Sequence, residues 1–163
     1  MFPSYGAYLF ITETLGHSKS LKTSNIYPGR QTNGSTITPA LGDASEGQLS
    51  VYGFWDTSLP NGAAFPTKLA LLNMEIYNET QWAAGVQRPA TIFDISAYQQ
   101  DKTKKVRLQR LQSTGADVKN GSFVTWAGQN YASGSATGTL TDNEWVDATA
   151  VTVAASEAVL VFL

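Results

Sequence analysis

The chain has 163 residues, of which 42% are hydrophobic and 15% are charged, and its formal net charge is −2. The low charge and high apolar content exclude an intrinsically disordered chain, and the length is that of one domain able to bury its own core. The chain combines 7 Phe, 7 Tyr and 4 Trp residues with many Thr, Ser, Gly and Val residues. That mixture favours short strands joined by turns over a helical bundle.

Residues 4–15 carry the one convincing helical pattern. Ser4 is a candidate N-cap, and Gly16 can adopt the positive φ that often follows the last turn of a helix. The interior of the segment is apolar almost all round, and such a helix has to be covered on every side. We therefore expect this helix either to fold onto the rest of its own chain or to mediate a homodimer.

Residues 17–47 are rich in Ser, Thr, Gly, Pro and Asn, which indicates an extended loop region with one or two short strands. From residue 48 onward, strand patterns alternate with turn signals. The predicted strands lie at residues 49–55, 68–77, 90–96, 106–109, 122–127, 151–153 and 158–163. The last two are expected to form a hairpin. The sequence thus predicts a single all-β domain over residues 1–163, with an antiparallel β-sandwich over residues 48–163 and one short N-terminal helix.

Two of these segments make finer predictions about burial. Leu49 and Val51 should face one way and Tyr52 and Phe54 the other, because successive side chains of a strand alternate. The segment 68–77 is almost wholly apolar in its first half, as in a strand buried on both faces.

A local basic cluster stands out against the negative net charge. It holds 5 of the 11 basic residues: Lys102, Lys104, Lys105, Arg107 and Arg110. A phosphate-binding groove and a sheet edge protected by charge are the two interpretations, and we favour the protected edge, since no glycine-rich or aromatic pattern accompanies the cluster. The net charge of −2 also supplies no overall field for nucleic acid, so we expect no nucleic-acid partner.

Catalytic and metal motifs are sparse. His17 is the single histidine, and no Gly-x-Ser-x-Gly nucleophile motif occurs. With no cysteine, a metal site would need oxygen ligands, of which Asp142, Asn143, Glu144 and Asp147 form the densest run. That run lacks the glycine of an EF-hand loop, and we expect a solvated turn. The sequence therefore predicts no metal site and no cofactor.

A few residues are candidates for hydrolysing or binding carbohydrate. Glycoside hydrolysis needs two carboxylates across a cleft, and no local pattern nominates a pair. Glu75 is the most unusual acid because it lies within the apolar stretch 69–77, but a solvated or edge face of a strand explains it. Trp82 and Trp145 occupy polar contexts, where an indole can stack on a sugar ring, so they are candidate carbohydrate-binding residues. Packing in the core or at its rim is the alternative for both.

Three N-x-S/T sequons, at Asn33, Asn78 and Asn120, lie among turn-forming residues and are candidate glycosylation sites. They favour an extracellular, secreted protein. The first residues lack a basic n-region, and their apolar run is far too short to cross a bilayer. We therefore expect no membrane association.

Several segments together resemble one enzyme family, the fungal glycoside hydrolases of family 79 (β-glucuronidase type). Residues 3–16 look like the last helix of the catalytic barrel of that family. The segments similar to strands of its C-terminal β-sandwich are residues 48–55, 71–73, 106–111, 124–129 and 153–161. The resemblance follows the chain in order over nearly its whole length.

This resemblance implies a domain without a reaction centre, because the family's two catalytic glutamates lie on barrel strands that have no counterpart here. We expect a non-catalytic module with a structural or accessory role beside a hydrolase barrel, and no catalytic residue. The alternative is a free-standing, secreted fungal carbohydrate-binding protein of lectin-like character, with a sugar as its partner.

Overall fold

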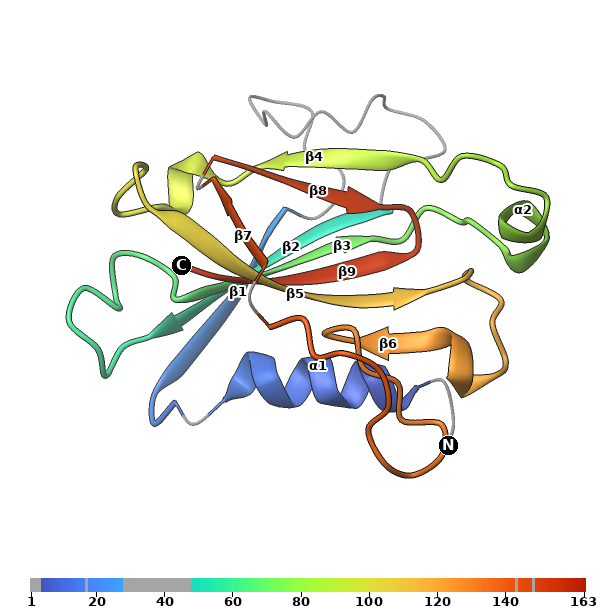
Figure 1. The fold of residues 1–163 in the computed structure, drawn as a ribbon. Helices are drawn as coiled ribbons and strands as arrows, with labels where there is room; N and C mark the ends of the chain where they lie inside the picture. Colours follow the sequence, from blue (N-terminus) through green and yellow to red (C-terminus); the bar gives the residue numbers. More distant parts are fainter. Residues whose placement is uncertain (1–3, 17, 28–47, 143, 148) are drawn as a thin grey trace.

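The structure is a computed structural model that describes residues 4–16, 18–27, 48–142, 144–147 and 149–163 (Figure 1). Its helices are α1 (Tyr5–Leu15) and the short α2 (Glu79–Ala83), with 3-10 turns at Ser96–Tyr98 and Gly121–Phe123. Its strands are β1 (Leu21–Tyr27), β2 (Leu49–Asp56), β3 (Lys68–Asn73), β4 (Ala90–Asp94), β5 (Lys105–Ser113), β6 (Val124–Trp126), β7 (Glu144–Asp147), β8 (Ala150–Ala154) and β9 (Glu157–Phe162).

The strands form two antiparallel sheets, which confirms the predicted all-β sandwich with one short N-terminal helix. A seven-stranded sheet runs in the order β1-β2-β3-β9-β5-β6, and β7 also pairs with β5. The other sheet consists of β4 and β8. In Figure 1 this small sheet lies above the large one and α1 lies below it, so the large sheet is the middle of three layers.

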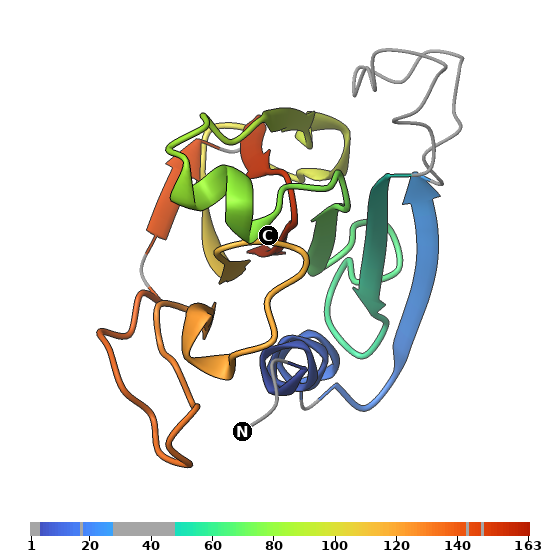
Figure 2. The same cartoon turned by 90° about the vertical axis from the view of Figure 1, so that its right-hand side faces the viewer.

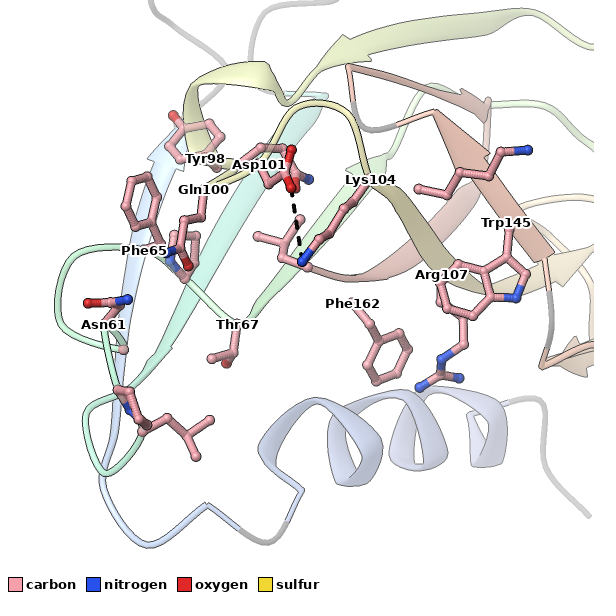
Figure 3. A pocket seen from close by; sticks show the side chains of 17 residues that line it. Asn61, Phe65, Thr67, Tyr98, Gln100, Asp101, Lys104, Arg107, Trp145 and Phe162 are labelled. Carbon is pink, nitrogen blue, oxygen red and sulfur yellow. Dashed lines mark ion pairs between the residues drawn. The ribbon is translucent and has the colours of Figure 1, made fainter.

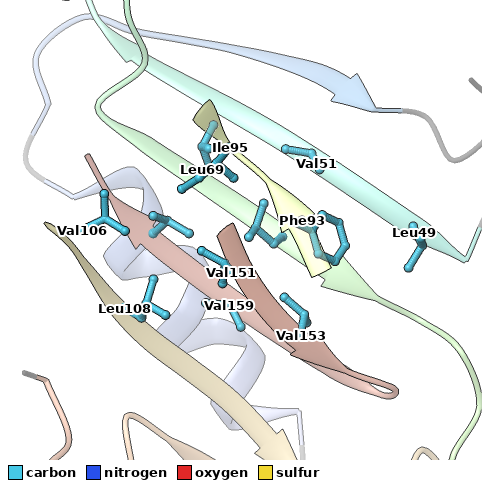
Figure 4. Packing of buried hydrophobic residues seen from close by; sticks show 12 residues of the cluster. Leu49, Val51, Leu69, Phe93, Ile95, Val106, Leu108, Val151, Val153 and Val159 are labelled. Carbon is cyan, nitrogen blue, oxygen red and sulfur yellow. The ribbon is translucent and has the colours of Figure 1, made fainter. Parts of the chain in front are cut away.

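The main core fills the space between the two sheets (Figure 4). Alternate residues of β2, β3, β5 and β9 meet residues of β4 and β8 there, together with the residue just after β4. The buried side chains are Leu49, Val51, Leu69, Leu71, Phe93, Ile95, Val106, Leu108, Val151, Val153, Val159 and Val161. Every one of these side chains is at most 4% exposed. The predicted alternation in β2 is confirmed, since Leu49 and Val51 enter this core while Phe54 points to the opposite face.

The opposite face of the large sheet packs against α1. Phe10 of the helix contacts Trp126 edge-on, with ring centres 5.4 Å apart, in a second apolar cluster that includes Ala70 and Leu160. Because Ala70 faces this cluster while Leu69 and Leu71 face the main core, β3 is buried on both faces as predicted. The helix therefore folds onto its own sandwich along one side (Figure 2).

Four local predictions need correction. The segments 151–153 and 158–163 do not form a hairpin, because β8 pairs with β4 while β9 pairs with β3 and β5. Their two-residue connection crosses between the sheets, with Ser156 at a φ of 57°. Arg88 holds this crossing by donating hydrogen bonds to the carbonyl oxygens of Ala155 and Ser156 at 2.6 and 3.0 Å.

The other corrections concern the basic cluster, the acidic run and the helix start. Strand β5, which carries Arg107 and Arg110, is not a sheet edge, since it pairs with β9 on one side and with β6 and β7 on the other. Glu144–Asp147 is a strand rather than a turn. Ser4 precedes α1 but forms no side-chain capping bond. None of the described helices is long and apolar enough to span a membrane.

Candidate functional site

A groove of about 780 Å³ opens at the end of the large sheet (Figure 3). The β2–β3 loop supplies Asn61 and Phe65 on one side, and the segment before β5 supplies Tyr98. Trp145 of β7 and Phe162 of β9 lie across from them (Figure 3). The groove thus combines loop residues with side chains that the sheet holds in place.

The β2–β3 loop reaches the groove through a close backbone approach. Asn61 adopts a φ of 61°, as its position in the Pro-Asn-Gly turn favours. A Cβ atom on Gly62 would lie only 1.8 Å from the carbonyl oxygen of Asp56, so this position admits glycine alone without a shift of the backbone.

The register of the large sheet explains why aromatic and basic side chains meet here. Directly opposed residues share one face of a sheet. One such row crosses five strands, from β2 through β3, β9 and β5 to β7: Phe54, Lys68, Phe162, Arg107 and Trp145. Aromatic and cationic side chains therefore alternate along this cross-strand row, and its last three members line the groove.

The middle of the row is tightly packed. The Arg107 guanidinium carbon lies 3.6 Å from the centre of the Phe162 ring, and the Lys68 ammonium lies 5.5 Å from the same centre. Lys68 also donates hydrogen bonds to the carbonyl oxygens of Glu13 and, at 3.1 Å, Thr14. A cation at the carboxyl end of a helix is favoured by the helix dipole. Lys68 thus ties the last turn of α1 to the sheet.

Burial lowers the pKa of Lys68, while Glu13 opposes that shift and Arg107 adds to it. Two more cations, Lys104 and Lys105, lie at the start of β5 and line the rim of the groove. There Lys104 forms an exposed ion pair with Asp101, with 4.0 Å between Nζ and Oδ2. Hydrogen bonds from Thr103 lower the pKa of Asp101.

Two further groups at the groove have unused hydrogen-bonding or charge capacity. Lys105 takes part in none of the ion pairs that the described residues form. Gln99 is 7% exposed, and within the described part of the chain its Nε2 atom has no hydrogen-bond partner. A buried donor without a partner costs about 1–3 kcal/mol, and because this Nε2 atom is itself enclosed, that cost falls on the stability of the fold at this wall of the groove.

Of the two tryptophans predicted to bind sugar, the structure brings only Trp145 to this groove. Its side chain is 54% exposed. Trp82 is 53% exposed but lies on α2, at the opposite end of the sandwich in Figure 1, where its ring is 6.5 Å from that of Phe123. Sequence reasoning noted Arg107 only as part of the basic cluster and missed Phe162, its partner in the groove.

Comparison with known families identifies the fold. The family model described as the glycosyl hydrolase family 79 C-terminal beta domain matches residues 51–160. The chain belongs to this family. No curated protein matches the chain.

Among solved structures, a 4-O-α-L-rhamnosyl-β-D-glucuronidase from Fusarium oxysporum 12S, crystallised as its Rha-GlcA complex, is similar to this family 79 C-terminal domain. The two share 22% identity with a TM-score of 0.56, which supports a common fold. The match covers 74% of the present chain and 25% of the enzyme, so the chain spans about a quarter of the enzyme's length.

Two glutamates of this family 79 domain bind one arginine. Glu144 and Glu157 converge on Arg110: two oxygens of Glu144 accept at 2.8 Å, and Glu157 accepts at 3.1 Å. Glu157 also accepts from Gln112 and from the backbone N–H of Ala154, and its side chain is 2% exposed. A carboxylate enclosed in this way has no access to a substrate, so the two glutamates do not form a glycosidase pair.

The remaining candidates occupy varied positions. Glu75 lies beyond the end of β3 and is half-buried. The side-chain oxygens of Asn78 and Asn120 accept from the backbone N–H groups of Gln81 and Ser122, so these bonds do not use the amide nitrogens to which glycans attach. Among the described residues no group of three or more acidic, histidine or cysteine side chains is arranged to hold a metal ion. His17, Asn33 and Asn143 lie outside the described residues.

Proposed function

We propose that this chain is a non-catalytic module that packs against the catalytic barrel of a family 79 glycoside hydrolase. The family assignment supports this role, because the matching model is that of the C-terminal β domain. The observation that carries the proposal is the uncovered apolar surface on and beside α1.

The outer side of α1 is apolar and exposed. Tyr8, Ile11 and Leu15 are 64%, 51% and 50% exposed, whereas Phe10 on the inner side is 8% exposed. A hollow of about 290 Å³ with almost wholly apolar walls runs beside the helix. A neighbouring hollow of about 460 Å³ shares part of its wall, including Leu72. Contiguous exposed apolar surface of this kind marks an interface.

The barrel of the same enzyme family is the occupant that this surface fits. The module accounts for about a quarter of the similar glucuronidase, so the rest of such an enzyme is available as a partner. A barrel helix layer presents apolar stripes that can cover Ile11 and Leu15. Pairing of two copies through the same face is the competing outcome.

A co-purification experiment tests this role. The tagged chain is co-expressed with the barrel segment of a family 79 enzyme, and the retained barrel is quantified. We expect Ile11→Asp to abolish retention, while the control Ile92→Asp, at a 62% exposed site on β4, leaves it unchanged. Equal retention by both variants, or a chain that forms dimers and ignores the barrel, would contradict the proposal.

We propose carbohydrate binding at the groove as a second candidate function, because Trp145 presents an exposed indole beside polar and cationic groups there. A glycan array probes it directly. Trp145→Ala should remove any binding, and Trp82→Ala, an equally exposed tryptophan outside the groove, should not. Binding lost in both variants alike would argue against a groove site.

A further inference from the structure

We infer that the exposed aromatic pair Trp82 and Phe123 is a docking platform for the chain's own N-linked glycan, attached at Asn120; this inference rests on use of the sequon at that position. The pair lies at the end of the sandwich marked by α2 in Figure 1. Trp82 is 53% exposed and Phe123 is 44% exposed, and their ring centres are 6.5 Å apart. Two large apolar rings therefore meet at the surface, where a ligand can cover both.

The aromatic pair is not part of the packed interior. Trp82 and Phe123 lie outside both apolar clusters of the described residues. All five residues of α2 are at least partly exposed, and the helix is held by the reciprocal bonds between Asn78 and Gln81 instead. Covering the two rings would remove apolar surface from water, which is favourable.

Each ring follows a sequon asparagine by one turn. Trp82 donates its backbone N–H to the carbonyl oxygen of Asn78 at 3.0 Å, and Phe123 donates to that of Asn120 at 3.1 Å. Side chains one turn apart lie on the same side of an α-helix or a 3-10 turn. A helical side chain also leans toward the start of its helix, which here means toward the preceding asparagine. A sugar on either asparagine would thus lie beside the aromatic pair.

Asn120 is the better attachment point of the two. It is exposed, whereas Asn78 is half-buried and bonded to Gln81 in both directions. The backbone N–H of Ser122 donates to Oδ1 of Asn120 at 3.0 Å, which orients the amide and leaves its nitrogen for the glycan. In the transfer, this nitrogen loses one proton and bonds to the anomeric carbon of the first N-acetylglucosamine. The pyrophosphate of the lipid-linked oligosaccharide donor leaves with the electron pair of the broken C–O bond.

The segments that carry the two rings are held in place by hydrogen bonds. At the start of α2 the backbone N–H of Glu79 donates to the carboxylate of Asp117 at 2.8 Å, which joins the helix to the loop before the 3-10 turn. The side chain of Asn130 donates to the carbonyl oxygens of Gly121 and Val124 at 2.6 and 2.9 Å and so holds the 3-10 turn itself. A surface that is already ordered loses little entropy when a ligand covers it.

The first sugar of an N-glycan suits this surface. One face of its pyranose ring consists of C–H groups, and its N-acetyl group adds a methyl, so it can stack on an aromatic ring. The bond to Asn120 keeps the sugar close to Phe123 at all times. This tether gives a high effective concentration, so a contact that would be weak between separate molecules is well populated here.

NMR of the glycoprotein, secreted from a eukaryotic host with an isotope-labelled glycan, tests the contact directly. Thr80→Ala and Ser35→Ala remove the other two sequons, so that Asn120 carries the single glycan. We expect the aromatic rings to shift the proton signals of the first N-acetylglucosamine upfield. Phe123→Leu and Trp82→Ala should each remove most of this shift. Trp145→Ala, at a similarly exposed tryptophan outside the pair, should leave it unchanged.

Thermal unfolding of the same proteins gives an independent measure. The glycosylated chain should melt about 2–4 °C above Ser122→Ala, which lacks the glycan but keeps the backbone donor to Asn120. With Phe123→Leu in both proteins, the glycan should raise the melting temperature by less than about 1 °C, because the glycan and the ring act through one contact. Circular dichroism of each unmodified variant should match that of the unmodified parent chain.

Three outcomes would overturn the inference. The first is an Asn120 that carries no glycan after secretion. The second is a glycan whose signals and stabilising effect are the same in the parent chain and in Phe123→Leu. The third is loss of barrel retention in Trp82→Ala, which would assign the aromatic pair to a protein interface. The first two outcomes leave the proposed packing of α1 against a barrel untouched, since α1 and the aromatic pair are separate surfaces.

Discussion

Arg107 and Phe162 form a stacked pair across neighbouring strands, with the guanidinium carbon 3.6 Å from the ring centre. Lys68 approaches the same ring from the other neighbouring strand, at 5.5 Å. One aromatic side chain thus brings together two cations that repel each other, and one of them also binds the carboxyl end of α1. The pair therefore connects the groove, the sheet and the helix.

Replacing Phe162 by leucine keeps an apolar side chain but removes both cation–π contacts. We expect the free energy of unfolding to fall by about 2 kcal/mol, from two such contacts and a smaller loss of packing. Urea denaturation measures this, with Phe123→Leu as the control, since Phe123 is 44% exposed and contacts the ring of Trp82 instead. A loss no larger than that of the control would show that the ring does not stabilise the two cations.

The two glutamates on Arg110 provide a matched pair of variants. Glu157 is 2% exposed and Glu144 is 38% exposed, yet both bind the same guanidinium. Removing one partner of a buried ion pair typically costs about 3–5 kcal/mol, whereas an exposed pair contributes about 1 kcal/mol or less. We therefore expect Glu157→Gln to destabilise the fold by about 3 kcal/mol and Glu144→Gln by less than about 1 kcal/mol.

Thermal unfolding of both variants checks this order. The reverse order would mean that the bidentate geometry of Glu144, with two bonds of 2.8 Å, outweighs burial. Arg110→Met then removes the shared partner: a double-mutant cycle with Glu157→Gln should show strong coupling, because the two side chains are in direct contact.

Periodicity in the sequence predicted most of the sheet, since burial there follows local alternation. Leu49 and Val51 fill the main core because the strand alternates, and Leu69 and Ala70 are both buried because an unbroken apolar run fits a middle strand. These features depend on a few neighbouring residues, so a short window of sequence contains them.

The predictions that were wrong, and the features that were not predicted, depend on residues far apart in the sequence. A hairpin was expected at residues 151–163, but Val151 is paired with Phe93 and Val159 with Arg110, so the connection crosses between sheets. Strand β7 has only four residues, and it forms because it pairs with β5, nearly 40 positions earlier in the chain. The groove likewise depends on sheet register, which places Phe162 beside Arg107. No local pattern encodes such pairings.

The turn that begins at Asp56 should make stability depend on pH. Hydrogen bonds from Ser58 lower the pKa of Asp56 from its usual 3.8. A carboxyl group with a lowered pKa in the folded state stabilises that state at pH values above its unfolded pKa, and the stabilisation is lost as the pH falls through the folded pKa. The contribution of Asp56 is therefore complete above about pH 5 and disappears on acidification below 3.8.

Asp56→Asn isolates this contribution. The difference in melting temperature between the parent chain and the variant should be largest near neutral pH and should shrink between about pH 5 and pH 2. Ser58→Ala should reduce the same pH-dependent difference, because it removes the hydroxyl donor but keeps the backbone donor. A difference that stays constant over this range would show that Ser58 does not act through the charge of Asp56.

Glycosylation at Asn120 would accord with the secretion that the three sequons favour. Asn120 is exposed and precedes a 3-10 turn, where its Oδ1 accepts from the backbone N–H of Ser122 at 3.0 Å. That bond leaves the amide nitrogen for the glycan, so modification should leave the fold intact. Asn78 caps α2 in a reciprocal bond with Gln81 and is half-buried, and we expect it to be modified less completely.

Secretion from a eukaryotic host followed by peptide mass spectrometry measures the occupancy of each site. Asn120→Gln and Ser122→Ala should both remove the glycan at position 120. Only the first also moves the acceptor oxygen, because the glutamine side chain is one methylene longer. Equal melting temperatures of the two variants would therefore assign the bond a minor role in stability. An unmodified Asn120 beside a fully modified Asn78 would contradict the prediction, because it would mean that exposure in the folded domain does not govern which sequon is used.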